Sequence, residues 1–191
     1  MVPELHLSNS DRSFLLSIAR QSIENSVNGD PLPPLELNSL SPQLREPGAC
    51  FVTLTCRGYL RGCVGALEPY QSLVEDVREH AIAAAFQDYR FPPVQANEIN
   101  DIEIEISYLT RPQILNYGEP AELPKILRPN IDGVVIHDGM RRATFLPQVW
   151  EKIPDAEMFL EELCMKMGSP ADLWRRKKLV VMTYQVEEFH E

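Results

Sequence analysis

The chain has 191 residues, with 28 acidic and 18 basic side chains and a formal net charge of −10. A negative field of this size repels phosphate backbones, so we expect no nucleic-acid binding. Hydrophobic residues make up 44%, but no run approaches the roughly 20 apolar residues of a membrane span. The first residues lack the apolar core of a signal peptide, and the four cysteines form no C-x-x-C pair. We therefore expect a cytoplasmic protein with reduced thiols and no membrane contact.

The first half of the chain alternates helical and strand patterns. Apolar residues at helical spacing follow Ser10, a suitable N-cap. A dense group of prolines then predicts an extended arm, because proline disfavours helix interiors and inner strands. Arg57 and Gly58 predict a two-residue turn between two strands. The predicted elements are a helix over 10–27, the arm over 30–48, strands over 49–56 and 59–65, and a helix over 71–87.

The second half favours antiparallel pairing. Isoleucines alternate with Glu103 and Glu105, as in a half-buried antiparallel strand, and Asp138-Gly139 predicts a hairpin turn. The predicted elements are strands over 102–110, 134–137, 140–146 and 179–184, and a helix from 155 that ends before Gly168. We expect an α+β fold, mainly antiparallel sheet packed with helices. The length suits one domain over 1–191, with or without a smaller subdomain. Neither a dinucleotide fingerprint nor a phosphate-binding loop occurs.

The hexapeptide LRGCVG at residues 60–65 is the candidate site. With the predicted two-residue turn, Leu54 pairs with Arg61 and Val52 pairs with Cys63. Arg61 and Cys63 then share one face of the sheet. A nearby guanidinium lowers a thiol pKa, and the thiolate is the reactive form. This register predicts Cys63 as a catalytic nucleophile, whereas a slip of one residue would separate the two side chains.

Each candidate also has a structural interpretation. Gly62 and Gly65 allow close approach by a ligand, or only a bulge and tight packing. Arg61 and Arg90 suit an anion pocket, since arginine recognises carboxylate and phosphate, but Arg90 also suits a helix terminus. Cys63 itself belongs to a residue type that often fills a core. His80 has no metal-ligand spacing, so we predict no metal site and no cofactor, although it is one candidate base for Cys63.

The hexapeptide closely resembles the LRGC(I/V)G signature of the AMMECR family, whose prokaryotic members are called AmmeMemoRadiSam system protein A. The departures are Val64, where isoleucine is common, and Tyr89, where proline is frequent. The resemblance runs from about Ser8 to Phe189. Its further segments are GACFVTL at 48–54, DYRFPP at 88–93, IEISYLT at 104–110, DGV at 132–134 and ATFLPQVW at 143–150.

The resemblance implies an α+β fold with a larger sheet-and-helix domain and a smaller subdomain, but no settled reaction. It also implies an association with a Memo-like protein and a radical SAM protein. Three hypotheses follow. In the first hypothesis, the chain is an accessory module that acts with those partners through the LRGCVG surface. In the second, it is an enzyme on a small anionic substrate that uses Cys63 with Arg61 and Arg90. In the third, it is a structural or regulatory binding domain. Exposure around Cys63 should separate them.

Overall fold

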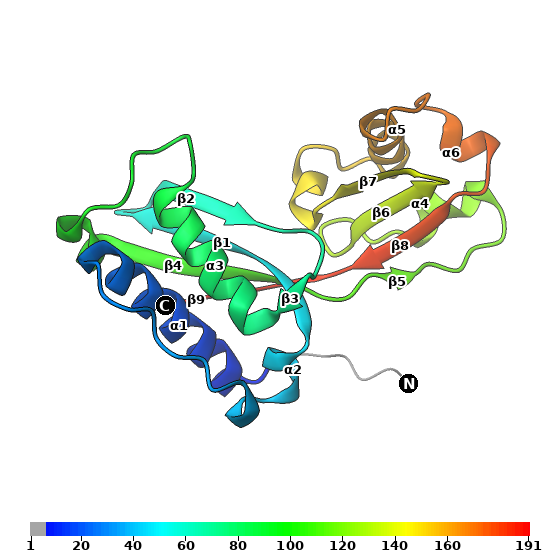
Figure 1. Cartoon of the computed structure of the whole chain (residues 1–191). Helices are drawn as coiled ribbons and strands as arrows, with labels where there is room; N and C mark the ends of the chain where they lie inside the picture. The colour runs from blue at the N-terminus through cyan, green and yellow to red at the C-terminus, as the bar shows by residue number, and fades with distance from the viewer. Residues whose placement is uncertain (1–6) are drawn as a thin grey trace. The chain divides into compact units, whose positions relative to one another are not determined.

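The computed structural model describes residues 7–191, which fall into two compact units (Figure 1). The larger unit comprises the chain up to Leu109 together with Glu187–Glu191, and the smaller unit is Thr110–Val186. Helices and antiparallel sheets occur in both units, which confirms the α+β class. Within residues 7–191, every helix is too short or too polar to cross a membrane.

The larger unit is a sheet with two helices on one face (Figure 1). The strand order is β2-β1-β4-β9, and β3 pairs with the start of β1. The elements are α1 (Asn9–Asn28), η1 (Leu37–Ser39), α2 (Pro42–Arg45), β1 (Pro47–Cys56), β2 (Tyr59–Gly65), β3 (Gln71–Ser72), α3 (Leu73–Phe86), η2 (Ala96–Asp101), β4 (Ile102–Leu109) and β9 (Val186–His190).

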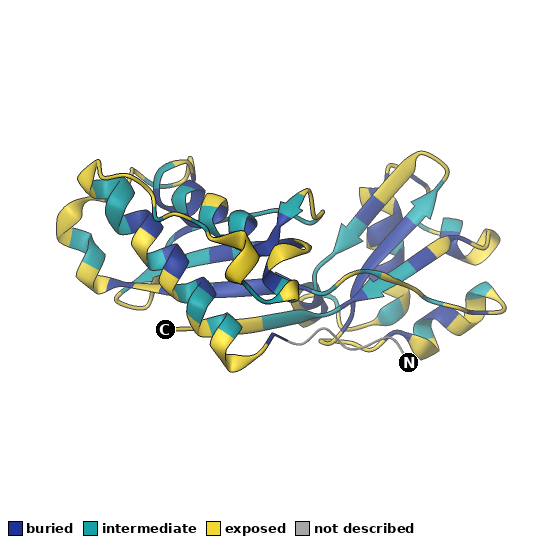
Figure 2. Ribbon diagram, turned by 60° about the horizontal axis from the view of Figure 1, so that its bottom comes forward, coloured by how far each residue is buried: buried dark blue, intermediate teal, exposed yellow. Residues whose placement is uncertain are grey.

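The core of the larger unit lies between this sheet and the helices α1 and α3. Val52, Leu54, Ile104 and Ile106 are completely buried against Leu15, Ile23, Val74 and Val77. Figure 2 shows the same division, with buried positions on the inner sides of the helices and exposed positions on their outer sides. Side chains alternate along a strand, so the opposite face of the sheet carries Thr53, Thr55, Glu103 and Glu105, which are half-buried or exposed. We call this the open face.

Three local predictions for the larger unit need correction. The N-cap of α1 is Ser8, which forms a capping box with Asp11, and not Ser10. The predicted arm contains the short helix α2, and Leu44 in this helix is buried. A helix can start at Pro42 because a proline at the first helical position loses no hydrogen bond. Residues 71–72 form β3 rather than the first turn of a helix.

The smaller unit has a four-stranded sheet in the order β5-β8-β6-β7. Its core contains Trp150 stacked on Phe159, with ring centroids 3.7 Å apart. The predicted hairpin exists, but its two-residue loop is Gly139-Met140, since Asp138 pairs with Arg141. The elements are β5 (Gln113–Ile114), η3 (Pro120–Glu122), α4 (Leu123–Ile126), β6 (Gly133–Asp138), β7 (Arg141–Phe145), η4 (Pro147–Glu151), α5 (Ala156–Lys166), α6 (Leu173–Arg176) and β8 (Val180–Tyr184).

Candidate functional site

The hairpin that carries the hexapeptide contains a β-bulge. Its turn is as predicted: Cys56 pairs with Tyr59, and both loop residues have positive φ. Beyond the turn the register shifts, and Leu54 pairs with Gly62. The predicted Leu54–Arg61 pair is therefore wrong. Arg61 is the additional residue that a bulge inserts into one strand.

The bulge reverses the face on which Cys63 lies. Cys63 pairs with Thr53 rather than with Val52, so its side chain belongs to the open face. The Thr53 hydroxyl donates a hydrogen bond to Cys63 Sγ at 3.2 Å. Thr53 also pairs with Glu105 on its other side, so the three residues form one row across the strands β2, β1 and β4. Cys63 as a residue is partly exposed.

The two glycines of the hexapeptide permit close packing. A Cβ on Gly62 would lie 2.1 Å from the carbonyl oxygen of Ala84 in α3. A Cβ on Gly65 would lie 2.4 Å from the carbonyl oxygen of Cys50. Real Cβ atoms do not approach so closely, so these positions exclude larger residues. The packing interpretation of both glycines accounts for this geometry, and no ligand is required to explain it.

The guanidinium of Arg61 forms an ion pair with the carboxylate of Glu98. Its Nε and Nη2 donate to the two carboxylate oxygens of Glu98, in η2, at 2.8 and 3.1 Å. These bonds raise the pKa of Arg61 and lower that of Glu98. The arginine side chain is only 12% exposed, and its Nη1 is buried with no partner among residues 7–191. Neither Glu103 nor Glu105 is its partner, and within these residues it makes no hydrogen bond to Cys63.

The peptide groups of Cys63 are held by the segment that follows α3. The Cys63 N–H donates to Asp88 Oδ2 at 2.9 Å, and Arg90 Nη2 donates to the Cys63 carbonyl oxygen at 3.3 Å. Arg90 also grips both oxygens of Asp88, at 2.9 and 2.6 Å. The hydrogen bonds from the Arg90 side chain, followed by those from the backbone N–H groups of Cys63 and Arg90, hold the pKa of Asp88 well below its usual range. Since β2 ends the sheet, this clamp satisfies backbone groups that point away from β1.

Comparison with known proteins identifies the family. The AMMECR1 family model matches residues 16–189. The chain belongs to the AMMECR1 family. A relative from Methanothermobacter thermautotrophicus is 39% identical over 97% of this chain and 96% of its own length. Protein MJ0810 from Methanocaldococcus jannaschii is 34% identical over 97% and 92%.

A solved structure supports the fold of this AMMECR1 domain. The crystal structure of uncharacterized protein PH0010 from Pyrococcus horikoshii has a TM-score of 0.72 and 35% sequence identity. The similarity covers 93% of this chain and 90% of that one. The solved structure therefore agrees with this architecture, and none of the names of these relatives states a reaction.

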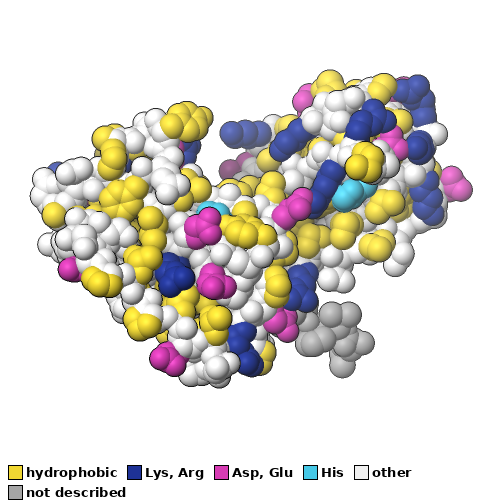
Figure 3. Space-filling view, in the orientation of Figure 1, with side chains coloured by type: hydrophobic (Ala, Val, Ile, Leu, Met, Phe, Trp, Pro, Cys, Tyr) yellow, Lys and Arg dark blue, Asp and Glu magenta, His cyan; other side chains and the backbone are white. Residues whose placement is uncertain are grey.

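A basic run, Arg175-Arg176-Lys177-Lys178, lies in the smaller unit, where Lys and Arg side chains gather (Figure 3). It spans the end of α6 and the residues after it. Arg175 pairs with Glu157 and Glu161, and Lys177 pairs with Asp138. Much of its positive charge is neutralised locally, so the run does not form a strongly cationic patch.

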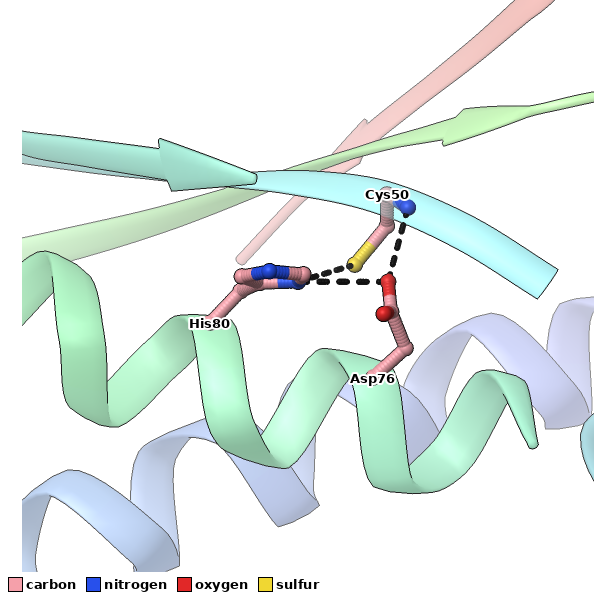
Figure 4. A group of neighbouring side chains, drawn as sticks. All are labelled: Cys50, Asp76 and His80. Carbon is pink, nitrogen blue, oxygen red and sulfur yellow. Dashed lines mark hydrogen bonds and ion pairs between the residues drawn. The ribbon is translucent and has the colours of Figure 1, made fainter. Parts of the chain in front are cut away.

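A second group of side chains in the AMMECR1 domain was missed by the sequence analysis. Cys50 in β1 points toward Asp76 and His80 in α3 (Figure 4). His80 Nδ1 lies 3.2 Å from Asp76 Oδ2 and 3.9 Å from Cys50 Sγ. All three residues are buried, and burial, followed by the charge of Asp76, raises the pKa of the Cys50 thiol. The i, i+4 spacing of Asp76 and His80 was a detectable signal. Only the tertiary structure brings Cys50 to them.

Proposed function

We propose that this chain is an accessory protein of a Memo-like protein and a radical SAM protein, and that it contacts them through the open face around Cys63. We define the Cys63 surface as Thr53, Thr55, Leu60 and Cys63. The strand register places Leu60 beside Thr55, and Cys63 beside Thr53, on this face. Leu60 is 44% exposed, and Cys63 is partly exposed. An exposed leucine beside a thiol and two hydroxyl groups can bury its apolar side chain in a protein contact and leave the polar groups free to form hydrogen bonds to the partner.

The observation that carries this proposal is the bonding of Cys63. Within residues 7–191, the hydrogen bond to its sulfur comes from the Thr53 hydroxyl, and no histidine or carboxylate contacts the sulfur. A catalytic thiol is usually activated by an adjacent general base that accepts its proton. His80, one candidate base, is bonded to Asp76 instead. This arrangement supports binding in preference to nucleophilic catalysis.

The state of the two arginines favours the same choice. An enzyme for a small anionic substrate would need the forks of Arg61 and Arg90 free to hold the anion. Glu98 takes two nitrogens of Arg61, and Asp88 takes two nitrogens of Arg90. A substrate carboxylate or phosphate would have to displace these internal carboxylates. The enzyme hypothesis is therefore the weaker candidate.

Co-purification of tagged protein with the Memo-like and radical SAM proteins encoded in the same genome tests the proposal. We expect a complex with wild-type protein. Leu60→Glu should weaken it at least tenfold, because a charge would enter an apolar contact. Met140→Glu is the matched control: Met140 is fully exposed in the smaller unit, in the turn between β6 and β7. This variant should bind as wild type does.

Two results would contradict the proposal. Failure of the wild-type protein to bind either partner, even after crosslinking, would remove the accessory role. If Leu60→Glu and Met140→Glu weaken the complex equally, or if neither variant weakens it, the Cys63 surface is not the contact.

Alkylation of Cys63 as a function of pH tests the enzyme alternative. A normal thiol pKa, unaffected by Arg90→Ala, would eliminate that mechanism.

A further inference from the structure

The buried group of Cys50, Asp76 and His80 gathers three different metal-ligand types at one point. A thiol sulfur, a carboxylate oxygen and an imidazole nitrogen all lie within 4.8 Å of one another. They are carried by two rigid elements, since Cys50 belongs to the central strand β1 and the other two lie one turn apart on α3 (Figure 4). No other such group occurs among residues 7–191.

The carboxylate of Asp76 is incompletely satisfied. Its Oδ2 accepts a hydrogen bond from the Cys50 N–H at 2.9 Å and contacts His80 Nδ1. Its Oδ1 is buried and has no partner within the described residues, and the residue is completely buried. A buried carboxylate oxygen without a partner is costly, so such an atom suggests that something else belongs beside it.

We propose that Cys50, Asp76 and His80 form a binding site for a divalent transition metal of the zinc class. In tetrahedral zinc sites, bond lengths of about 2.3 Å to sulfur and 2.0 Å to nitrogen or oxygen place neighbouring ligand atoms about 3.3 to 3.5 Å apart. His80 Nδ1 lies 3.9 Å from Cys50 Sγ and 3.2 Å from Asp76 Oδ2, and all three ligand atoms lie within 4.8 Å of one another. Side-chain shifts of about 1 Å would bring them to coordination distances.

The charges also balance. Binding of Zn²⁺ replaces the thiol proton of Cys50, which leaves as H⁺, and joins the metal to one thiolate, one carboxylate and one neutral imidazole, with a water molecule as the fourth ligand. The two negative charges neutralise the ion, so burial of the complex carries no net charge. The Cys50 N–H donates to Asp76 and holds the carboxylate in place, as outer hydrogen bonds do in metal sites.

A catalytic relay does not fit the same geometry. A Cys-His-Asp relay uses the two nitrogens of the imidazole, one toward the thiol and one toward the carboxylate. Here both Cys50 and Asp76 contact the same atom, His80 Nδ1. Convergence on one nitrogen leaves no path for a proton through the ring. A shared ion accounts for that convergence.

Cobalt substitution is the direct test. The full-length protein, reduced and stripped with a chelator, is titrated with Co²⁺ and monitored for the thiolate-to-cobalt charge-transfer band in the near ultraviolet. We expect a band that saturates near one equivalent and is displaced by Zn²⁺. Cys50→Ser should abolish the band. Asp76→Asn, whose amide oxygen can still accept from the Cys50 N–H, should weaken binding at least tenfold.

Two control variants separate this site from other thiols. Cys63→Ser removes a partly exposed cysteine and Cys164→Ser removes the other buried one, and both should leave the band unchanged. Circular dichroism of each variant verifies folding. If Cys50→Ser does not fold, the cobalt affinity of Asp76→Asn tests the site instead. Absence of the band in wild-type protein with excess Co²⁺, persistence of the band in Cys50→Ser, or undiminished affinity in Asp76→Asn would overturn the proposal.

Discussion

Replacement of Gly62 by alanine should separate the helix α3 from the strand β2. The new Cβ would lie 2.1 Å from the carbonyl oxygen of Ala84, where an ordinary contact is at least 3.4 Å. The obstacle is helix backbone, which cannot rotate away as a side chain can. Helix and strand must therefore move apart by about 1 Å, which loosens the packing of α3 on the core.

We expect Gly62→Ala to lower the stability of the larger unit by about 3 kcal/mol, the upper end of the usual range for overpacking. Gly58→Ala, at the turn of the same hairpin, is the matched control. A Cβ there would meet nothing within 4 Å, and its φ of +80° is the only obstacle. A left-handed backbone conformation costs an alanine about 1 kcal/mol. The two substitutions therefore differ in packing and not in residue type.

The assay must report on the larger unit. Trp150 and Trp174 both lie in the smaller unit, so tryptophan fluorescence does not follow it directly. Native-state hydrogen exchange of the β4 amides measures the free energy of opening in the larger unit. A loss of stability in Gly62→Ala no greater than that in Gly58→Ala would refute the packing argument, and the glycine would then need another explanation.

Three further predictions concern separate parts of the chain. Asp88→Asn should lower the free energy of unfolding by about 2 kcal/mol at neutral pH, as measured by urea unfolding. Because Arg90 lowers the folded-state pKa of Asp88, the difference in stability between wild type and variant should shrink as pH falls below about 4. A difference that grows at acid pH would contradict this prediction. Phe159→Ala should lower the stability of the smaller unit by about 3–5 kcal/mol, because the ring is completely buried against Trp150; an unmoved midpoint by tryptophan fluorescence would be inconsistent with that core. Ser8→Ala should cost about 1 kcal/mol through loss of the capping box, and unchanged exchange protection in the first turn of α1 would argue against it.

Much of the fold was predictable because its signals are local. Alternation of isoleucine and glutamate located β4 and the face that it buries. Arg57 and Gly58 located the turn of the first hairpin, whose two central residues need positive φ. The short elements α2, β3, α4 and β5 were missed, because two to four residues carry too little periodicity to be recognised. The five-residue strand β9 was also missed, since the last predicted strand ended at residue 184.

The candidate site was predictable in its position but not in its geometry. The sequence alone determined the family, the α+β class and the segment that contains Cys63, since these depend on residue types and their order. Only the tertiary structure decided which face Cys63 occupies. The bulge at Arg61 reversed that face. A bulge is defined by two residues of one strand opposing one residue of the next, so its position is fixed only when β2 pairs with β1. The same holds for the partners of buried polar groups. Glu98 is the partner of Arg61, and Cys50 is the partner of Asp76. In each pair the two residues are far apart in the sequence and meet only when the chain folds.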